Sequence, residues 1–499
     1  MHRNSPILFL IYGGFMLTLA GCLNKHTQGE KLAQKYCGNC HLTPIPQQLD
    51  QATWRESVLP MMGLRLGLLP SASSLAQQSV YFELKQAGQI STQPLITPQE
   101  WEQIKDYYLK NAPKILVGTY PKLPINQHFI PINSPLIAST TPTVTCIRWD
   151  THQQHIWLSD NVTHQIYQIN AQQQIVATIG MPTPVSDIYL QGDTLWVTSV
   201  GSIQPSQQKN GVVMCFVKKQ NQWQFVQSSP VLHRPAKSLI FKPKSNAKSQ
   251  IITAEFGFLT GQLAIWNQDF SEKKILSNLS GALQIETTDF NNDGLLDLVV
   301  LFGQGDENLS VFLQQPNGTF QQKILLQFPA VYGSTSFLMQ DFDQDGLLDI
   351  AYTCGDNADY SPILKPYHGL YIYQQQTSGQ FRERFFYPIN GAYKVLAGDF
   401  DLDKDLDLIT ISFFADYLHR PQESVVVFEH QNKFNFNPSG IDIAQAGRWI
   451  DADLGDIDED GDLDILLANC SVAQPLKGGL EAHWRNGKHY SILLNQHIK

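Results

Sequence analysis

From about residue 140 onward, apolar residues come in short runs separated by polar turns, a pattern typical of β-strands. Three such runs are Leu298–Leu301, Ser310–Leu313 and Ile324–Leu326. The Asn317-Gly318 pair between the last two runs is a hairpin turn signal. Runs of this kind recur at intervals of roughly fifty residues, and a period of that size indicates a β-propeller or another repeat array.

The repeated unit can be aligned seven times. Four copies carry an acidic loop, and three weaker copies without that loop lie upstream, at Ile147–Leu158, Val185–Val197 and Leu239–Thr253. An apolar strand follows each weak copy, for example Gln262–Trp266. The sequence therefore predicts a mainly β fold, a seven-bladed β-propeller. An eight-bladed quinoprotein propeller is the nearest alternative, but its tryptophan-rich docking repeats are not evident.

The N-terminal region shows a helical pattern instead. The segment Gln28–Tyr36 can form a first helix, and Thr97 can cap a second one that has Pro98 in its first turn and Glu100 at the third position. This second helix should end near Asn111. Its apolar positions recur on one face, at Trp101, Ile104, Tyr107, Tyr108 and Leu109. A small all-α domain is therefore expected before the propeller.

The first residues read as an export signal. The basic pair His2-Arg3 precedes an apolar stretch, Pro6–Ala20, which is shorter than the roughly 20 residues of a membrane-spanning helix. The letters LAGC that end at Cys22 resemble the bacterial lipobox, in which the cysteine is lipidated. The resemblance implies a lipid anchor on a bacterial membrane, facing the periplasm or the cell surface. The alternative is a signal peptide or anchor that happens to contain a cysteine.

One close pair of cysteines has the spacing of covalent haem attachment. Cys37 and Cys40 are separated by two residues and followed by His41, the C-x-x-C-H signature of c-type haem. The two thiols form thioethers with the haem vinyl groups, and the histidine binds the iron. A redox C-x-x-C pair or half of a zinc site would need a βαβ context or a second ligand pair, and neither is evident. We therefore predict one covalent haem c here.

The second axial ligand of this haem is predicted by exclusion. Between Leu42 and Ala112 there is no other histidine, and the only methionines are Met61 and Met62. Either methionine could also be simple core filler. The stretch Val58–Gly67 resembles the ligand loop of small exported cytochromes fused to repeat domains. In that loop the methionine that matches Met62 is the ligand, so the resemblance favours Met62 over Met61.

Four nine-residue stretches concentrate the acidic side chains. They read DFNNDGLLD, DFDQDGLLD, DFDLDKDLD and DIDEDGDLD, and their starting points are 52, 58 and 57 residues apart. Side-chain oxygens at loop positions 1, 3, 5 and 9 with a backbone carbonyl at position 7 can surround a hard cation. The predicted calcium ligands are Asp289, Asn291, Asp293, Asp297, Asp341, Asp343, Asp345, Asp349, Asp399, Asp401, Asp403, Asp407, Asp456, Asp458, Asp460 and Asp464.

Three to four calcium ions are expected, because the third loop has Lys404 at position 6, where the other loops have glycine. These loops are not EF-hands, since position 12 lacks the required glutamate and holds Val300, Tyr352, Thr410 or Leu467. Solvated turns between strands are the alternative for any single loop. Four aligned copies favour a cation, because up to six acids within nine residues repel one another without one.

Composition and charge exclude several classes of protein. With 42% hydrophobic and 16% charged residues, the chain is neither disordered nor a coiled coil. The net charge is −10, but the four loops hold 18 of the 45 Asp and Glu residues. The remainder of the chain is therefore slightly basic, and no basic run indicates nucleic-acid binding.

The acidic loops resemble the FG-GAP, or VCBS, repeats of integrin-like β-propellers. With the lipobox and the haem motif, the chain resembles bacterial lipoproteins that join an N-terminal c-type cytochrome domain to such a propeller. The implied organisation is a signal peptide over residues 1–21, a cytochrome c-like domain over 22–112, a proline-rich linker over 113–140 and the propeller over 141–499.

The leading functional hypothesis is electron transfer with a redox partner protein. A low-spin haem with His and Met ligands has no open coordination position and a raised potential, so it exchanges electrons rather than activating oxygen. In this hypothesis the propeller binds a partner or ligand. Two alternatives stay open: an enzyme whose propeller oxidises a small molecule and passes electrons to the haem, and a non-redox adhesion or glycan-binding lipoprotein.

Two further features are weaker signals. The segment Cys354–His368 reads as a long insertion after the second acidic loop, and a structural cap is its main interpretation. If the chain were an enzyme, Asp356, Asp359 and His368 would be candidates for a base on one exposed loop. Four scattered cysteines are expected to be small buried residues or, in an oxidising compartment, disulfide partners: Cys146, Cys215, Cys354 and Cys470.

Overall fold

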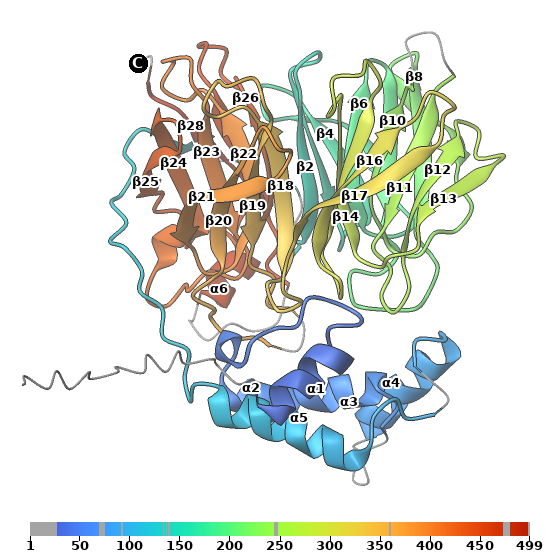
Figure 1. Ribbon diagram of the computed structural model, residues 1–499. Coiled ribbons are helices and arrows are strands. Elements are labelled where there is room, and N and C mark those ends of the chain that lie inside the picture. Colours follow the sequence, from blue (N-terminus) through green and yellow to red (C-terminus); the bar gives the residue numbers. More distant parts are fainter. Residues whose placement is uncertain are drawn as a thin grey trace, which may run out of the picture.

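The structure places a helical region across one end of a ring of β-sheets (Figure 1). It is a computed structural model that describes residues 27–68, 75–90, 93–132, 134–135, 137, 140–243, 248–358, 361–472 and 480–497. The expected signal peptide and Cys22 lie outside the described residues.

Five α-helices make up the described part of the helical region. They are α1 (Gln28–Tyr36), α2 (Gln51–Thr53), α3 (Leu59–Arg65), α4 (Leu75–Gln86) and α5 (Pro98–Asn111), and a π-helical turn over Trp54–Val58 joins α2 to α3. At the start of α5, the Thr97 hydroxyl accepts from the Glu100 N–H (3.2 Å), and the Glu100 carboxylate accepts from the Thr97 N–H (3.0 Å). This reciprocal capping confirms the helix start predicted from the sequence.

Helices α1, α3 and α5 share an apolar core, which we call the helical core cluster. Its buried members include Leu32, Leu49, Trp54, Ile104 and Tyr108. Helices α1 and α5 cross at Gly29, where a Cβ atom would lie 2.3 Å from the Gln103 carbonyl oxygen. Only a residue without a side chain allows this close approach of the two backbones.

Seven four-stranded antiparallel sheets form the ring in the described part of the chain, which confirms the predicted seven-bladed propeller. Blades 1 to 3 are β2 (Val144–Asp150), β3 (His155–Asp160), β4 (Gln165–Ile169) and β5 (Ile175–Gly180); β6 (Val185–Gln191), β7 (Thr194–Ser199), β8 (Val212–Lys219) and β9 (Gln222–Ser228); β10 (Pro235–Phe241), β11 (Gln250–Glu255), β12 (Gln262–Asn267) and β13 (Lys273–Ser277).

The later blades follow the same order from the inner to the outer strand. Blades 4 to 6 are β14 (Ala282–Thr288), β15 (Asp297–Phe302), β16 (Asn308–Gln314) and β17 (Phe320–Gln327); β18 (Ser334–Gln340), β19 (Asp349–Cys354), β20 (Gly369–Gln375) and β21 (Phe381–Pro388); β22 (Ala392–Gly398), β23 (Asp407–Ser412), β24 (Val425–Asn432) and β25 (Asn435–Gly440). Blade 7 contains β26 (Trp449–Gly455), β27 (Asp464–Asn469) and β28 (Tyr490–Leu494), and the short helix α6 (Glu481–Arg485) lies between the last two strands.

Blade 7 takes its outermost strand from the segment that precedes blade 1 in the sequence. This strand, β1 (Ile130–Ile132), pairs antiparallel with β28, with Ile130 opposite Leu494. It belongs to the segment 113–140, which the sequence analysis treats as a linker. Upstream in the same segment, Leu123 is buried against the propeller core, and the Asn126 N–H donates to the Gly440 carbonyl (2.8 Å). Much of the expected linker is therefore part of the propeller.

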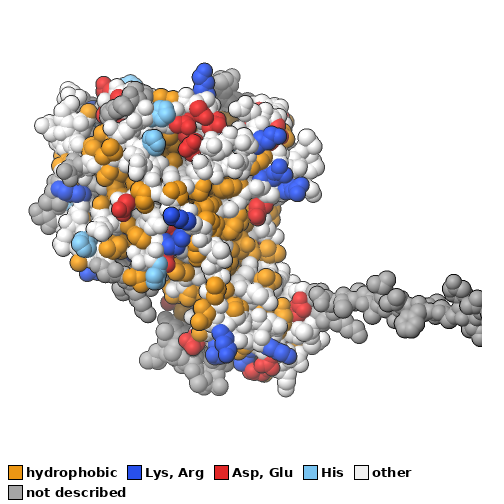
Figure 2. Space-filling model, turned by 90° about the vertical axis from the view of Figure 1, so that its left-hand side faces the viewer, with side chains coloured by type: hydrophobic (Ala, Val, Ile, Leu, Met, Phe, Trp, Pro, Cys, Tyr) orange, Lys and Arg blue, Asp and Glu red, His pale blue; other side chains and the backbone are white. Residues whose placement is uncertain are grey.

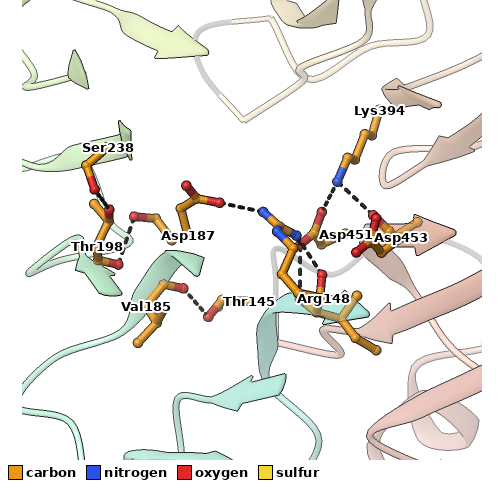
Figure 3. Close-up of polar contacts among 12 residues, drawn as sticks. Thr145, Arg148, Val185, Asp187, Thr198, Ser238, Lys394, Asp451 and Asp453 are labelled. Atoms are coloured by element: carbon orange, nitrogen blue, oxygen red, sulfur yellow. Dashed lines mark hydrogen bonds and ion pairs between the residues drawn. The ribbon is translucent and has the colours of Figure 1, made fainter. Parts of the chain in front are cut away.

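The innermost strands carry a group of ion pairs, which we call the closure cluster (Figure 3). Arg148 on β2 contacts Asp187 on β6 (2.6 Å) and Asp451 on β26 (2.5 Å). Asp451 also contacts Lys394 on β22 (2.6 Å) and accepts a hydrogen bond from the Ile147 N–H (3.0 Å). The cluster thus joins blades 1, 2, 6 and 7 across the centre of the ring.

The closure cluster shifts the ionisation of its central acid. Burial alone would raise the pKa of Asp451, but the Arg148 and Lys394 cations outweigh burial and hold this pKa well below its usual range. An acid whose pKa is depressed by folding adds stability that is present above about pH 4 and is lost as the pH falls further.

The two faces of the ring carry different strand connections. In an antiparallel blade, the connection from the first to the second strand and the connection from the second to the third leave opposite faces. The four acidic loops are first-to-second connections, whereas residues that contact the helices, such as Leu259 and Tyr367, lie in second-to-third connections. The acidic loops therefore lie on the face away from the helical region (Figure 1). None of the described helices is both long and apolar enough to cross a membrane.

Arg148→Met tests the closure cluster. The substitution should lower the free energy of unfolding by roughly 3 kcal/mol at neutral pH, because it leaves Asp187 without this cation and Asp451 with Lys394 alone. Urea titration followed by tryptophan fluorescence measures the change. Arg382→Met, at an exposed position of β21, is the control and should cost less than about 0.5 kcal/mol. Equal effects would contradict the role assigned to Arg148.

Candidate functional site

The C-x-x-C-H segment begins where α1 ends. The Cys37 N–H donates the last hydrogen bond of the helix to the Ala33 carbonyl (2.8 Å). The Cys40 N–H donates to the Cys37 carbonyl (3.3 Å). Both cysteines are free thiols; Cys37 is half-buried, and Cys40 is exposed. Burial, and secondarily the nearby Cys40, raises the pKa of the Cys37 thiol to about 11. His41 lies partly exposed, with Nδ1 3.0 Å from the Leu42 carbonyl oxygen.

The two candidate methionines follow each other on α3 but have different neighbours. Met61 is buried in a second apolar cluster that includes Leu259 of the propeller. Met62 is half-buried and borders both this cluster and the helical core cluster. Cys37 also borders the helical core cluster. Met62 and Cys37 therefore lie against one apolar core, whereas Met61 packs toward the propeller.

The chemistry of these side chains fits a covalent haem c. The thiols are free to form thioethers, and an apolar core adjoins Cys37 and Met62. A His41 ring that donates its Nδ1–H to the Leu42 carbonyl keeps the Nε2 lone pair for a metal, which is the usual arrangement of a ligating histidine. Trp101 packs close to α3 because Gly63 faces its ring, where a Cβ would lie at 3.2 Å.

On the opposite face of the ring, the aspartate at position 1 folds each acidic loop. In the first loop, Asp289 accepts hydrogen bonds from the N–H groups of Asp293 (3.0 Å) and Gly294 (2.9 Å). Asp341 makes the equivalent two bonds in the second loop. Side-chain oxygens therefore organise the turn itself, which explains why the pattern begins with aspartate.

The aspartate at position 9 begins the second strand and is fully buried. Asp297 accepts from the N–H of Phe290 (3.0 Å) within the loop and from that of Gln314 (2.7 Å) at the end of the third strand. The corresponding aspartates of the other loops make both bonds too: Asp349, Asp407 and Asp464. Each of these carboxylates thus ties a loop to its blade.

Carboxylate oxygens converge in three of the loops. Within each group one oxygen per residue lies within 4.8 Å of the others; the groups are Asp341, Asp343 and Asp349; Asp399, Asp401 and Asp407; and Asp456, Asp458 and Asp460. In the first loop, Asn291 stands at position 3 and donates to Asp293 (2.9 Å). Ionised oxygens this close repel one another unless a cation offsets their charge.

The third loop follows the same path although it lacks glycine at position 6. Lys404 has φ +78°, close to the values of Gly294 (+83°), Gly346 (+86°) and Gly461 (+100°). A non-glycine residue in this left-handed conformation carries a cost of order 1 kcal/mol. The turn is therefore preserved at Lys404, with strain and an added positive charge.

In the described part of the insertion after the second acidic loop, one of the expected base candidates is buried. His368 is fully buried, and burial, followed by the nearby Lys365, lowers its pKa well below the usual value. Asp359 lies outside the described residues. Instead, Tyr367 donates to the Gln48 carbonyl (3.1 Å) of the helical region. His368 is therefore not an exposed base, and Tyr367 of the insertion supports the helices.

Sequence reasoning missed the residues that join distant parts of the chain. Arg148 and Asp451 are charged residues within largely apolar strands, which is the signal that could have indicated them. Leu259 gives no such signal. The four scattered cysteines are buried and free, in agreement with the expectation that they are small buried residues: Cys146, Cys215, Cys354 and Cys470.

Comparisons with known proteins identify part of this arrangement. The FG-GAP-like repeat family matches residues 289–352, which include the first two acidic loops. Cartilage acidic protein 1 of Xenopus tropicalis is 29% identical over 198 residues, which are 34% of this chain and 28% of that relative. The match thus spans less than a third of the relative's length.

Solved structures with low similarity include the N-terminal domain of Nup159 and Saccharomyces cerevisiae Sqt1. The first has 11% identity over 76% of this chain and 99% of its own, with a TM-score of 0.43. The second has 11% identity over 70% and 84%, with a TM-score of 0.42. Taken together with the seven sheets, the family match defines this chain as a seven-bladed β-propeller with FG-GAP-like repeats.

The buried carboxyls at position 9 predict a specific pH dependence without bound cations. Burial, with a smaller contribution from the neighbouring loop carboxylates, outweighs the backbone hydrogen bonds and raises the pKa to about 7 for Asp349 and to about 6 for Asp407 and Asp464. An acid whose pKa is raised by folding favours the folded state at low pH. This contribution to stability is lost as the pH rises through the pKa that the acid has in the folded state.

In chelator-treated protein, the stability of the wild type relative to Asp349→Asn should therefore fall as the pH rises from 5 to 8, because only the wild type must ionise a buried carboxyl. Urea titrations across this range measure the difference. Asp442→Asn, at an exposed position, is the control and should show no such trend. A constant difference between wild type and Asp349→Asn would contradict the electrostatic account.

Proposed function

We propose that this chain is an exported haem c electron-transfer protein whose calcium-stabilised propeller binds a redox partner or another ligand. The observation that carries the proposal is the C-x-x-C-H segment at the end of α1, with Cys37 and Met62 bordering one apolar cluster. A bound haem c would supply a one-electron redox centre.

Each side chain has a distinct part in this proposal. Cys37 and Cys40 hold the group covalently, and His41 and Met62 are its axial ligands. Because two axial ligands leave no open coordination position, the site exchanges electrons rather than activating a substrate. The helical core cluster keeps water from the Cys37 and Met62 side, whereas Cys40 is exposed and leaves that side accessible to a partner protein.

Calcium in the acidic loops is the second part of the proposal. The converging oxygens of three loops, the buried carboxylate at position 9 and the left-handed turn at position 6 all suit a hard cation with oxygen ligands. A bound cation would offset the repulsion among the carboxylates. The loops would then contribute to the stability of blades 4 to 7 rather than oppose it.

Membrane attachment is the third part and rests on the sequence alone. Lipidation of Cys22 would anchor the chain to a bacterial membrane and expose it to the periplasm or the cell surface. Cys22→Ala should release the protein into the soluble fraction after cell lysis, as judged by immunoblotting. Membrane attachment of this variant equal to that of the wild type would contradict the anchor.

Variants of the haem motif test the main proposal. Joint Cys37→Ala and Cys40→Ala should abolish covalent haem, measured by the pyridine haemochrome spectrum of the denatured protein. Met62→Ala should keep the covalent haem but lose the weak red absorption of a Met–Fe bond and lower the potential. Met61→Ala, at the neighbouring position, is the comparison variant and should keep a Met–Fe band. Absence of covalent haem in the wild type would contradict the proposal, and loss of the band only in Met61→Ala would reassign the ligand.

Metal analysis tests the calcium sites. The purified protein should contain three to four calcium ions per chain, and Asp345→Ala should remove one of them. A cation held at about 100 times its Kd stabilises the folded state by about 2.7 kcal/mol per site, so chelation should lower the Tm clearly. The exposed Asp442→Ala is the control and should keep the full count. Fewer than two ions per chain would contradict the proposal.

A further inference from the structure

A short loop of blade 3 reaches into the helical region beside the two methionines. It connects β11 to β12, and we call residues 256–261 the blade 3 hook. Leu259, at its tip, is only 5% exposed and shares an apolar cluster with Met61, Leu64 and Leu84. Phe258 and Met62 border the same cluster. The propeller therefore covers the side of α3 that carries the methionines.

The backbone of the hook is held in one conformation by its own turn. Gly257 has φ +66°, and a Cβ there would lie 1.8 Å from the Thr260 carbonyl oxygen, so only glycine fits. The Phe258 N–H donates to the same carbonyl (3.0 Å), and the Gly257 N–H donates to the His233 carbonyl (3.1 Å). The loop is thus a tight, hydrogen-bonded turn.

Side chains of blades 2 and 3 fix the hook from outside. The Gln207 side chain accepts from the Leu259 N–H (3.0 Å). The Arg234 guanidinium donates to the Gly257 carbonyl (2.5 Å) and to the carbonyls of Ser202 and Ile203 (both 3.0 Å). The hook therefore meets the helices as a preorganised support whose position is set by the propeller.

Helix α3 consequently lies between two apolar supports. The helical core cluster contacts it through Leu59 and Met62, and the hook contacts it through Met61 and Leu64. The helix has only seven residues and bends directly out of a π-helical turn, so its own hydrogen bonds give it little rigidity. Its position depends on both supports.

We infer that Leu259 is a positioning residue for the methionine ligand: the hook holds α3 so that Met62 keeps its place, and it excludes water from that side. This inference rests on the proposed function, because it presumes a haem with Met62 as a ligand. Its consequence is that the propeller, and not the helical region alone, sets the ligation and potential of the redox centre.

Leu259→Ala in the full-length, haem-loaded protein tests the inference. The covalent haem content should stay unchanged, while the red Met–Fe absorption weakens and the midpoint potential falls. Hydrogen exchange of the backbone amides in 59–65 should become roughly tenfold faster or more, because truncating a buried leucine removes a large share of the contact that holds the helix. Leu259→Ile should restore most of both signals.

Two further variants keep the test decisive if Leu259→Ala folds poorly. Gln207→Ala removes the hydrogen bond to the hook backbone and should give the same changes in smaller measure. Leu263→Ala, on β12 of the same blade, truncates a fully buried leucine whose cluster does not include α3. It should lower propeller stability and leave the Met–Fe band and the exchange of α3 as in the wild type.

The possible failures are distinguishable. A wild type without covalent haem or without the Met62 band defeats the proposed function and this inference with it. If the wild type has both, but Leu259→Ala and Leu263→Ala show the same spectrum, potential and α3 exchange as each other, the inference alone is defeated. Faster exchange in Leu259→Ala with an unchanged band and potential would also overturn it, because the hook would then support the helix without controlling the ligand.

Discussion

The ring has to close between its first and last blades. The contacts that close it also determine where the helical region lies. Backbone pairing of β1 with β28 completes blade 7, and Arg148 joins blades 1 and 2 to Asp451 of that blade. Because β1 belongs to the segment that follows α5, the same pairing brings the helical region to one end of the ring. The strand that completes the propeller therefore also tethers the helical region to it.

This arrangement places the acidic loops and the C-x-x-C-H motif on opposite faces of the ring. The acidic loops lie on one face, where buried position-9 carboxylates hold each loop to its blade at an electrostatic cost. The helical region with its thiols, histidine and methionines lies on the other face. A cation bound in the loops would affect the haem motif only through the stability of the ring. Figure 2 shows one side of the molecule, on which acidic side chains gather at the end of the propeller farthest from the helical region.

The propeller also supports a helical region that has a small core of its own. Tyr367 donates to the Gln48 carbonyl, Ile363 and Val331 pack against the helical core cluster, and the blade 3 hook packs against α3. Burial of apolar surface at these contacts stabilises the helices beyond what their short length allows. A change in the propeller can therefore alter the environment of the methionines without touching the haem motif itself.

The sequence by itself determined the features that depend on neighbours within a few turns. The repeat period predicted seven blades, the Thr97–Glu100 spacing predicted the start of α5, and the order of aspartates predicted loops in which their oxygens converge. Local hydrogen bonds and alternating burial specify each of these, so their spacing is visible in the chain. The C-x-x-C-H motif is local in the same way.

Only the tertiary structure decided how distant segments meet. Arg148 and Asp451 are 303 residues apart, β1 lies in a segment that reads as a linker, and Leu259 has no pattern that distinguishes it from other core leucines. His368 was a candidate base on an exposed loop but is fully buried, next to Tyr367, which donates to the Gln48 carbonyl of the helical region. Such contacts depend on how seven twisted sheets close into a ring, and no short stretch of sequence encodes that geometry.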